Sequence, residues 1–212
     1  GNGLKVMQEI NTMKKLITWL GDTLNIFKIL FIIFFLSFSP SLVQSSERWV
    51  LDKTLSTIEF ELPVLFAKNV QGKFNTIEGF VKLDVDKKQN NKAIFSVQVD
   101  DLEMNYIKYK NLLLSNVFFD STQFPKAVID TKKFSYDNEE EIELNVELTL
   151  KGKSEMVPLK IYIKRLAEEL VQIQSELIFS RTKFDIGIGK WQNTSILKDK
   201  VKLKTNLFLF RE

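Results

Sequence analysis

Arg181 is the charged residue whose position in the sequence points most clearly to chemistry. It follows Leu177 and Phe179 at intervals of two, so on a continuing β-strand all three side chains point to the same side. A buried guanidinium must be paired. Its partner is either the phosphate or polar group of a bound ligand, which the planar fork of arginine suits, or a carboxylate. Three aspartates are candidates for the carboxylate: Asp52, Asp101 and Asp185.

Side chains that could act in catalysis are scarce. The 212 residues include no cysteine and no histidine, which removes the thiolate nucleophile, the usual general base and the commonest zinc ligands. No pair of carboxylates stands out among the inward positions, and the "GIGK" at residues 187–190 is too short for a phosphate loop and is expected to be a turn. We therefore expect a protein that is not an enzyme, with no catalytic residue and no metal site. The net charge of +3 without a long basic block gives no support for nucleic-acid binding.

The first 45 residues differ in composition from the rest. Three lysines give them a basic start: Lys14, Lys15 and Lys28. Residues 29–38, "ILFIIFFLSF", form an apolar run shorter than the roughly 20 residues that span a bilayer. Val43 and Ser45 then suit a signal-peptide cleavage after Ser45. This predicts an N-terminal extension and signal peptide over residues 1–45 and one exported domain, periplasmic or secreted, over residues 46–212. An uncleaved N-terminal anchor is the alternative.

From Trp49 onward, apolar residues recur at every second position. In "FVKLDVD", for example, Val81, Leu83 and Val85 share one face. Such alternation predicts antiparallel strands with one buried and one exposed face. With a further strand beginning near Ala127, at least eight strands are expected, which indicates a β-barrel or a β-sandwich. The alternating runs are residues 56–64, 80–86, 94–99, 141–150, 157–163, 170–179 and 201–210.

Residues 112–130, "LLLSNVFFDSTQFPKAVID", interrupt the alternation. Phe118 and Phe119 are adjacent, and on a strand their rings would point to opposite faces. Asn116 is a good helix N-cap, and one helical turn over residues 117–120 would bring both rings toward the same apolar surface. The segment therefore predicts a lid that closes one end of a barrel with aromatic side chains.

The residues on either side of this turn carry their own expectations. Residues 106–114 could form a short helix that bears Ile107, Leu113 and Leu114. Pro125 is expected to stop any helix and to start the next strand from the edge of a sheet.

Five motifs stand in a fixed order along the chain. They are "WVLDKTLSTIEF" at residues 49–60, "VQGKFNTIEGFVKLD" at 70–84, "LLLSNVFFDSTQFPKAVIDT" at 112–131, "VELTLKGKSEMVPLKI" at 146–161 and "FSRTKFDIGI" at 179–188. In this order they resemble the YceI-like family, exported lipocalin-like barrels that bind polyisoprenoid lipids. The family commonly has histidine where Leu55 stands, and another near residues 66–68. If those histidines contact a head group in relatives, that contact is absent here.

The resemblance implies an all-β fold: an extended eight-stranded antiparallel lipocalin-like β-barrel with short helices near one mouth, preceded by the signal peptide. It also implies a long apolar cavity. An eight-stranded barrel can be filled by its own side chains or can hold one small ligand, and the sequence leaves both open. The residues expected to line such a cavity are Phe60, Leu62, Phe74, Phe95, Val97, Phe118, Phe119, Ile129, Leu148, Phe179 and Arg181.

The function expected from this resemblance is lipid binding. An apolar cavity would hold a polyisoprenoid, a quinone-like lipid or another long-chain amphiphile, for transport, storage or sequestration in the bacterial envelope. No cofactor is expected other than such a lipid. A filled barrel that acts as an envelope interaction protein is the main alternative, and an enzyme on isoprenoid lipids is a weaker one. Membrane or envelope contact and a homodimer are left open.

Overall fold

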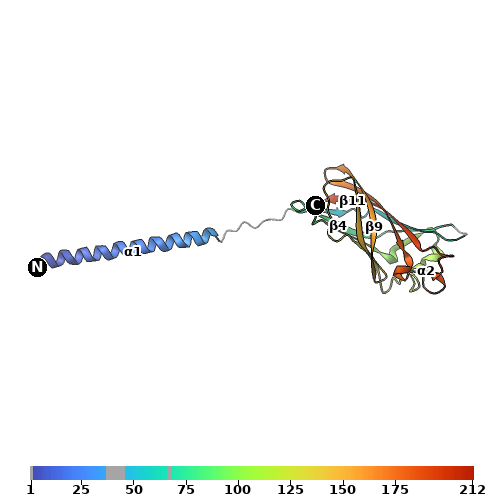
Figure 1. Cartoon of the computed structure of the whole chain (residues 1–212), viewed down its shortest axis with the longest axis horizontal. Helices are drawn as coiled ribbons and strands as arrows, with labels where there is room; N and C mark the ends of the chain where they lie inside the picture. Colours follow the sequence, from blue (N-terminus) through green and yellow to red (C-terminus); the bar gives the residue numbers. More distant parts are fainter. Residues whose placement is uncertain (1, 37–45, 66–67) are drawn as a thin grey trace. The chain divides into compact units, whose positions relative to one another are not determined.

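The computed structural model of the protein describes residues 2–36, 46–65 and 68–212 (Figure 1). The chain divides into two compact units, residues 1–43 and residues 44–212. Helix α1 (Asn2–Leu36) belongs to the first unit. Among the described residues, no helix combines the length and hydropathy needed to cross a membrane. Val43 and Ser45, which suggested the cleavage site, lie outside the described residues, and the signal peptide stays a prediction.

The second unit is built from strands, as the alternating pattern predicted. In the part of the chain that the structure describes, the strands are β1 (Ser46–Leu51), β2 (Thr57–Leu62), β3 (Val70–Phe74), β4 (Ile77–Asp84), β5 (Lys92–Gln98), β6 (Leu102–Met104), β7 (Lys126–Asp130), β8 (Glu141–Leu150), β9 (Lys153–Ala167), β10 (Leu170–Ser180) and β11 (Lys200–Arg211). The short helices are η1 (Val99–Asp101), η2 (Ile107–Tyr109), α2 (Lys110–Leu114), η3 (Arg181–Phe184) and η4 (Gly189–Gln192).

Eight of these strands close into an antiparallel barrel, which confirms the predicted fold. They follow the order β1-β4-β5-β7-β8-β9-β10-β11, and β11 closes the ring by pairing with β1, where Leu51 lies opposite Leu209. Strands β2, β3 and β6 extend the wall from β11 in that order. Strand β6 was not predicted, because its three residues are too few to show a period.

The two ends of the barrel differ in construction. One end carries α2, the loop that follows it, and the loop between β10 and β11, and we call it the lid end. The other, which we call the far end, carries the turns β4–β5, β7–β8 and β9–β10 together with the start of β1 and the end of β11. Figure 1 shows α2 and the C-terminus at opposite ends of the barrel.

Two local predictions were wrong. Val85 is exposed rather than inward, because β4 ends at Asp84, whose Oδ1 accepts a hydrogen bond from the Lys87 amide (2.9 Å) and turns the chain. Pro125 does not lie at a sheet edge, because β7 pairs with both β5 and β8. It precedes the first residue of the strand, where no ladder N–H is needed, and its carbonyl accepts from the Val99 amide at 2.8 Å.

Candidate functional site

An apolar lumen runs inside the barrel, because alternate residues of every strand point inward. Toward the lid end it forms a chamber of about 60 Å³, and Ser96 is the only polar side chain among its described lining residues. Toward the far end a second chamber has a volume of about 100 Å³. Ile58, Phe95 and Ile129 line both chambers, so the two lie end to end. A cavity with such walls is dry unless an apolar ligand fills it.

The structure brings ten of the eleven predicted lining residues together around the lid-end chamber. They are Phe60, Leu62, Phe74, Phe95, Val97, Phe118, Phe119, Ile129, Leu148 and Phe179. Several of the rings also pack on one another, and the centroids of Phe60 and Phe74 lie 5.8 Å apart. These residues therefore form the wall of the chamber and also pack against one another.

Arg181 is the predicted residue that lies elsewhere. Strand β10 ends at Ser180 and the chain turns into η3, so the alternation that placed Arg181 on the lumen wall stops one residue too early. Its side chain is fully buried and donates five hydrogen bonds, all to backbone carbonyls. The acceptors are Lys198 (Nε, 2.9 Å), Ile186 and Gly187 (Nη1, 2.9 and 3.4 Å), and Trp191 and Leu197 (Nη2, 2.7 and 2.7 Å).

The expected partners of Arg181 were therefore both wrong. Among the described residues no carboxylate forms a salt bridge with it, and its donors are all taken up by the chain itself. Burial lowers the pKa of Arg181, and the charge of Asp199 opposes that shift. Gly187 fits this arrangement because its φ is +81° and a Cβ there would lie 2.7 Å from Nη1. The arginine fixes the loop between η3 and β11 from inside.

The lid closes the lumen as predicted, but its backbone has a different conformation from the predicted helical turn. Phe118 and Phe119 both line the lid-end chamber, and Phe118 is almost fully buried. Residues 116–119 form a hydrogen-bonded turn rather than a helix. The turn is organised by Ser115, whose carbonyl accepts from the amides of Phe118 (3.0 Å) and Asp120 (2.8 Å), so Asn116 caps no helix. The short helix expected over residues 106–114 is present as η2 followed by α2.

The backbone of the lid is tied to its neighbours. The carbonyl of Val117 accepts from the amides of Gly187 (2.9 Å) and Ile188 (3.1 Å) in the loop that Arg181 holds. From the β8–β9 turn, Lys151 Nζ donates to the carbonyl of Asn116 at 2.6 Å, and burial lowers the pKa of this lysine. A lid fastened in this way favours movement of side chains over movement of the whole segment.

A groove lies outside the lid, and sequence analysis did not predict it. It has a volume of about 290 Å³, and we call it the vestibule. Leu62, Leu113 and Phe118 line both the vestibule and the lumen, so these three side chains separate the two. The ring centroids of Phe118 and Trp191 lie 5.8 Å apart at this boundary. The remaining lining residues are Val64, Lys68, Val70, Tyr106, Lys108, Tyr109, Leu112, Trp191 and Leu197.

The far-end chamber has a few polar groups that sequence analysis did not single out as candidates. The hydroxyls of Ser175 and Thr205 lie 2.6 Å apart on its wall. Tyr136 and Arg165 also line it. Burial raises the pKa of Tyr136, and the charge of Arg165 opposes that shift. These groups could meet a polar end of a ligand but form no acid–base pair with an inward carboxylate.

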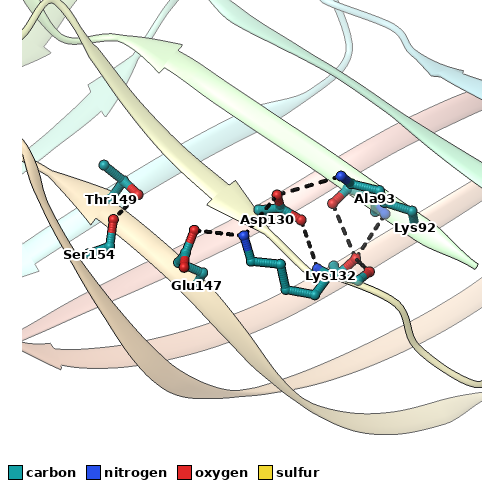
Figure 2. Close-up of polar contacts among 8 residues, drawn as sticks. Lys92, Ala93, Asp130, Lys132, Glu147, Thr149 and Ser154 are labelled. Atoms are coloured by element: carbon teal, nitrogen blue, oxygen red, sulfur yellow. Dashed lines mark hydrogen bonds and ion pairs between the residues drawn. The ribbon is translucent and has the colours of Figure 1, made fainter.

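A polar network on the barrel wall has a structural explanation (Figure 2). Lys132 Nζ lies 2.9 Å from Glu147 on β8 and 3.4 Å from Asp130 on β7, and Lys92 on β5 lies 3.7 Å from Asp130. Burial would raise the pKa of Asp130, but the Lys132 amide and the two lysine charges outweigh it and lower that pKa. The network fastens the short strand β7 to both neighbours. Among the described residues, no three potential metal ligands cluster anywhere.

Comparison with known proteins agrees with this architecture. The family model described as a YceI-like domain matches residues 49–209. A solved structure of Burkholderia cenocepacia BcnA is 22% identical, with a TM-score of 0.67 over 74% of this chain and 98% of that one. A polyisoprenoid binding domain from Saccharophagus degradans, described as implicated in plant cell wall breakdown, is 15% identical, with a TM-score of 0.61 over 77% and 98%. A Campylobacter jejuni YCEI protein is 20% identical, with a TM-score of 0.59 over 71% and 89%. No curated protein matches the chain significantly.

Proposed function

Since this chain belongs to the YceI-like family, we propose that its lumen holds one long-chain lipid, a polyisoprenoid or a quinone-like molecule. The observation that carries the proposal is the almost wholly apolar space inside a closed barrel. A protein core is normally packed without such voids, so a lumen of this kind costs stability unless a ligand occupies it. A flexible chain suits the two small chambers because they lie end to end, and the side chains that line them would move apart as the chain enters.

The relatives support the class of ligand. The Saccharophagus degradans domain that shares this fold is described as polyisoprenoid binding. In the present chain the wall of the lid-end chamber is made by side chains with no polar atoms apart from Ser96. Hydrogen bonds could then be made only near the ends of a bound molecule, which is where an isoprenoid or quinone carries its polar group.

We further propose that the protein acts by binding, in the periplasm or outside the cell, and carries or sequesters its lipid in the bacterial envelope. The basic and apolar segments before Ser46 support export. The inward polar groups of the far-end chamber are hydroxyls and a guanidinium, which without an inward carboxylate do not make a general acid–base pair.

Extraction of the purified protein with organic solvent, followed by mass spectrometry, tests the proposal. We expect about one lipid per chain, chemically unchanged. Ile129→Trp should lower this ratio, because Ile129 lies where the two chambers meet and a larger ring would block the lumen. Ile178→Trp is the matched control, since Ile178 is exposed on the outer wall. An extract without lipid would favour a filled barrel that acts as an interaction surface, and a chemically altered lipid would indicate an enzyme.

A further inference from the structure

Three segments surround the vestibule and form one surface at the lid end. They are residues 63–65 with 68–70, residues 105–112 and residues 186–198, and we call them the lid-end surface. They contain no aspartate or glutamate and five lysines: Lys68, Lys108, Lys110, Lys190 and Lys198. Asp185 and Asp199 lie directly beyond the ends of the third segment, but Asp185 pairs with Lys153 and Asp199 accepts hydrogen bonds from Ser180 and Thr182. Among the described residues, none of the five lysines forms a salt bridge, so the surface carries a net positive charge.

The far end has no comparable charge. Its segments are residues 46–49, 84–92, 131–141, 163–170 and 210–212, which together hold nine basic and ten acidic residues, a net charge of 9 − 10 = −1. Many of these charges also pair, as Arg211 does with Glu47 at 3.8 Å. The positive charge is therefore a property of one end of the barrel rather than of the whole surface.

The lid-end surface is also apolar to an unusual degree for an exposed region. Ile107 is 82% exposed and Ile196 is 51% exposed, and Leu65, Tyr109 and Ile188 add further exposed apolar area. Leu65 and Ile196 belong to neighbouring loops, joined by a hydrogen bond from the Leu65 amide to the Ile196 carbonyl at 3.0 Å. Exposed apolar side chains that gather in one region mark a contact surface.

We propose that the lid-end surface docks on an anionic lipid bilayer, and that lipid passes between the bilayer and the lumen through the vestibule, past Leu113 and Phe118. Lysines near an anionic bilayer surface strengthen binding, by about fivefold each. Tyrosine and tryptophan, here Tyr106, Tyr109 and Trp191 at the vestibule, suit the boundary between head groups and acyl chains. The passage of lipid rests on the proposed function, whereas the docking does not.

The charge also decides between a bilayer and a second copy of the chain. Two copies that met through this surface would bring five lysines against five more, and like charges repel. A bilayer with anionic lipids neutralises the lysines without needing a matching arrangement of partner residues. The vestibule is the second reason to expect a bilayer. It lies on this same surface, and three shared side chains separate it from the lumen.

A fluorescent probe on a single cysteine can show which end of the barrel meets the membrane. The chain has no cysteine, so Ile107→Cys at the lid end and Val85→Cys at the far end each give a unique labelling site in the full chain. With an environment-sensitive nitrobenzoxadiazole label, we expect a blue shift at position 107 when phosphatidylcholine vesicles containing phosphatidylglycerol are added, and no shift at position 85. Because the probe reports its own surroundings, binding through helix α1 does not produce this pattern.

Charge reversal tests the electrostatic part. Lys108→Glu with Lys190→Glu should weaken binding to the vesicles. The vesicle concentration that gives half of the probe response at position 107 should rise at least about 25-fold, because each lysine contributes about fivefold. Lys133→Glu with Lys164→Glu is the matched control, because both lysines are exposed at the far end and the change in net charge is the same. The response should also fall as salt is raised.

The outcomes separate docking from lipid binding. No shift at position 107 with any vesicle, an equal shift at position 85, or an equal loss in both double variants would overturn the docking. So would a shift at position 107 that appears with an added protein or with rising protein concentration but not with vesicles. The lipid content of the purified protein is measured independently, so a chain that docks but contains no lipid disproves the proposed function alone. A chain that contains lipid but does not dock disproves this inference alone.

Discussion

Replacing Arg181 with methionine should destabilise the lipid-free protein strongly. The side chain donates to five backbone carbonyls, and the contacts with Ile186 (2.9 Å) and Leu197 (2.7 Å) are both short and buried. Methionine fills similar volume but donates nothing, so these two carbonyls lose their donor. A buried polar group left without a partner costs about 1–3 kcal/mol, which gives a loss of about 2–6 kcal/mol. That is a large part of the roughly 5–15 kcal/mol that holds a typical domain folded.

Urea unfolding of the delipidated protein, followed by circular dichroism, measures this loss. Arg181→Lys should lie between the parent and Arg181→Met, because one ammonium group has three donors and cannot reach acceptors on both sides of the loop. Lys183→Met is the control on the same short helix, where the side chain is exposed and its ion pair with Glu155 is long at 3.7 Å. We expect that control to stay within about 0.5 kcal/mol of the parent.

A second measurement locates the effect. Hydrogen exchange in Arg181→Met should rise first in residues 186–198, because the arginine holds that loop from inside. If Arg181→Met instead unfolded like the parent and bound lipid less tightly, the guanidinium would belong to the ligand site. Our interpretation of Arg181 as a structural anchor would then be wrong.

Three further predictions concern the gate, acid stability and processing. Phe118→Ala should release bound lipid faster than the parent, because Phe118 separates the lumen from the vestibule. Phe184→Ala is the control: this ring is fully buried but lines neither space, so its truncation should lower stability without faster release of lipid. The pKa of Asp130 is lower in the folded protein than in the unfolded chain, so its contribution to stability is present above about pH 4 and is lost as pH falls through the folded pKa. Thermal melts should therefore decline less steeply in acid for Asp130→Asn than for the parent, with exposed Asp100→Asn as the control for loss of one carboxylate. N-terminal sequencing of the exported protein should begin at Ser46, and a retained residue 14–38 segment would show an anchor instead.

The sequence by itself determined the antiparallel strands and most of the side chains that face inward, whereas the choice of a barrel over a sandwich came from the resemblance to the YceI-like family. Alternation at every second residue fixes which side chains face inward on a strand, so the inward positions of Phe60, Phe95 and Phe179 follow from the alternation alone. The adjacent rings of Phe118 and Phe119 likewise indicated a lid, because no strand can turn both toward one surface. These inferences needed only the local period of the chain.

Tertiary structure decided what depends on contacts between distant segments. Arg181 left the predicted wall because β10 ends one residue earlier, at the point where carbonyls of residues 186–198 fold back to surround the guanidinium. The period of a strand carries no information about where that strand stops. The vestibule arises in the same way, since it joins segments from residues 62–65 and 68–70, 106–113 and 191–197 that share no sequence pattern. Its lysines look like ordinary solvated residues in each loop, and only the fold gathers them on one face.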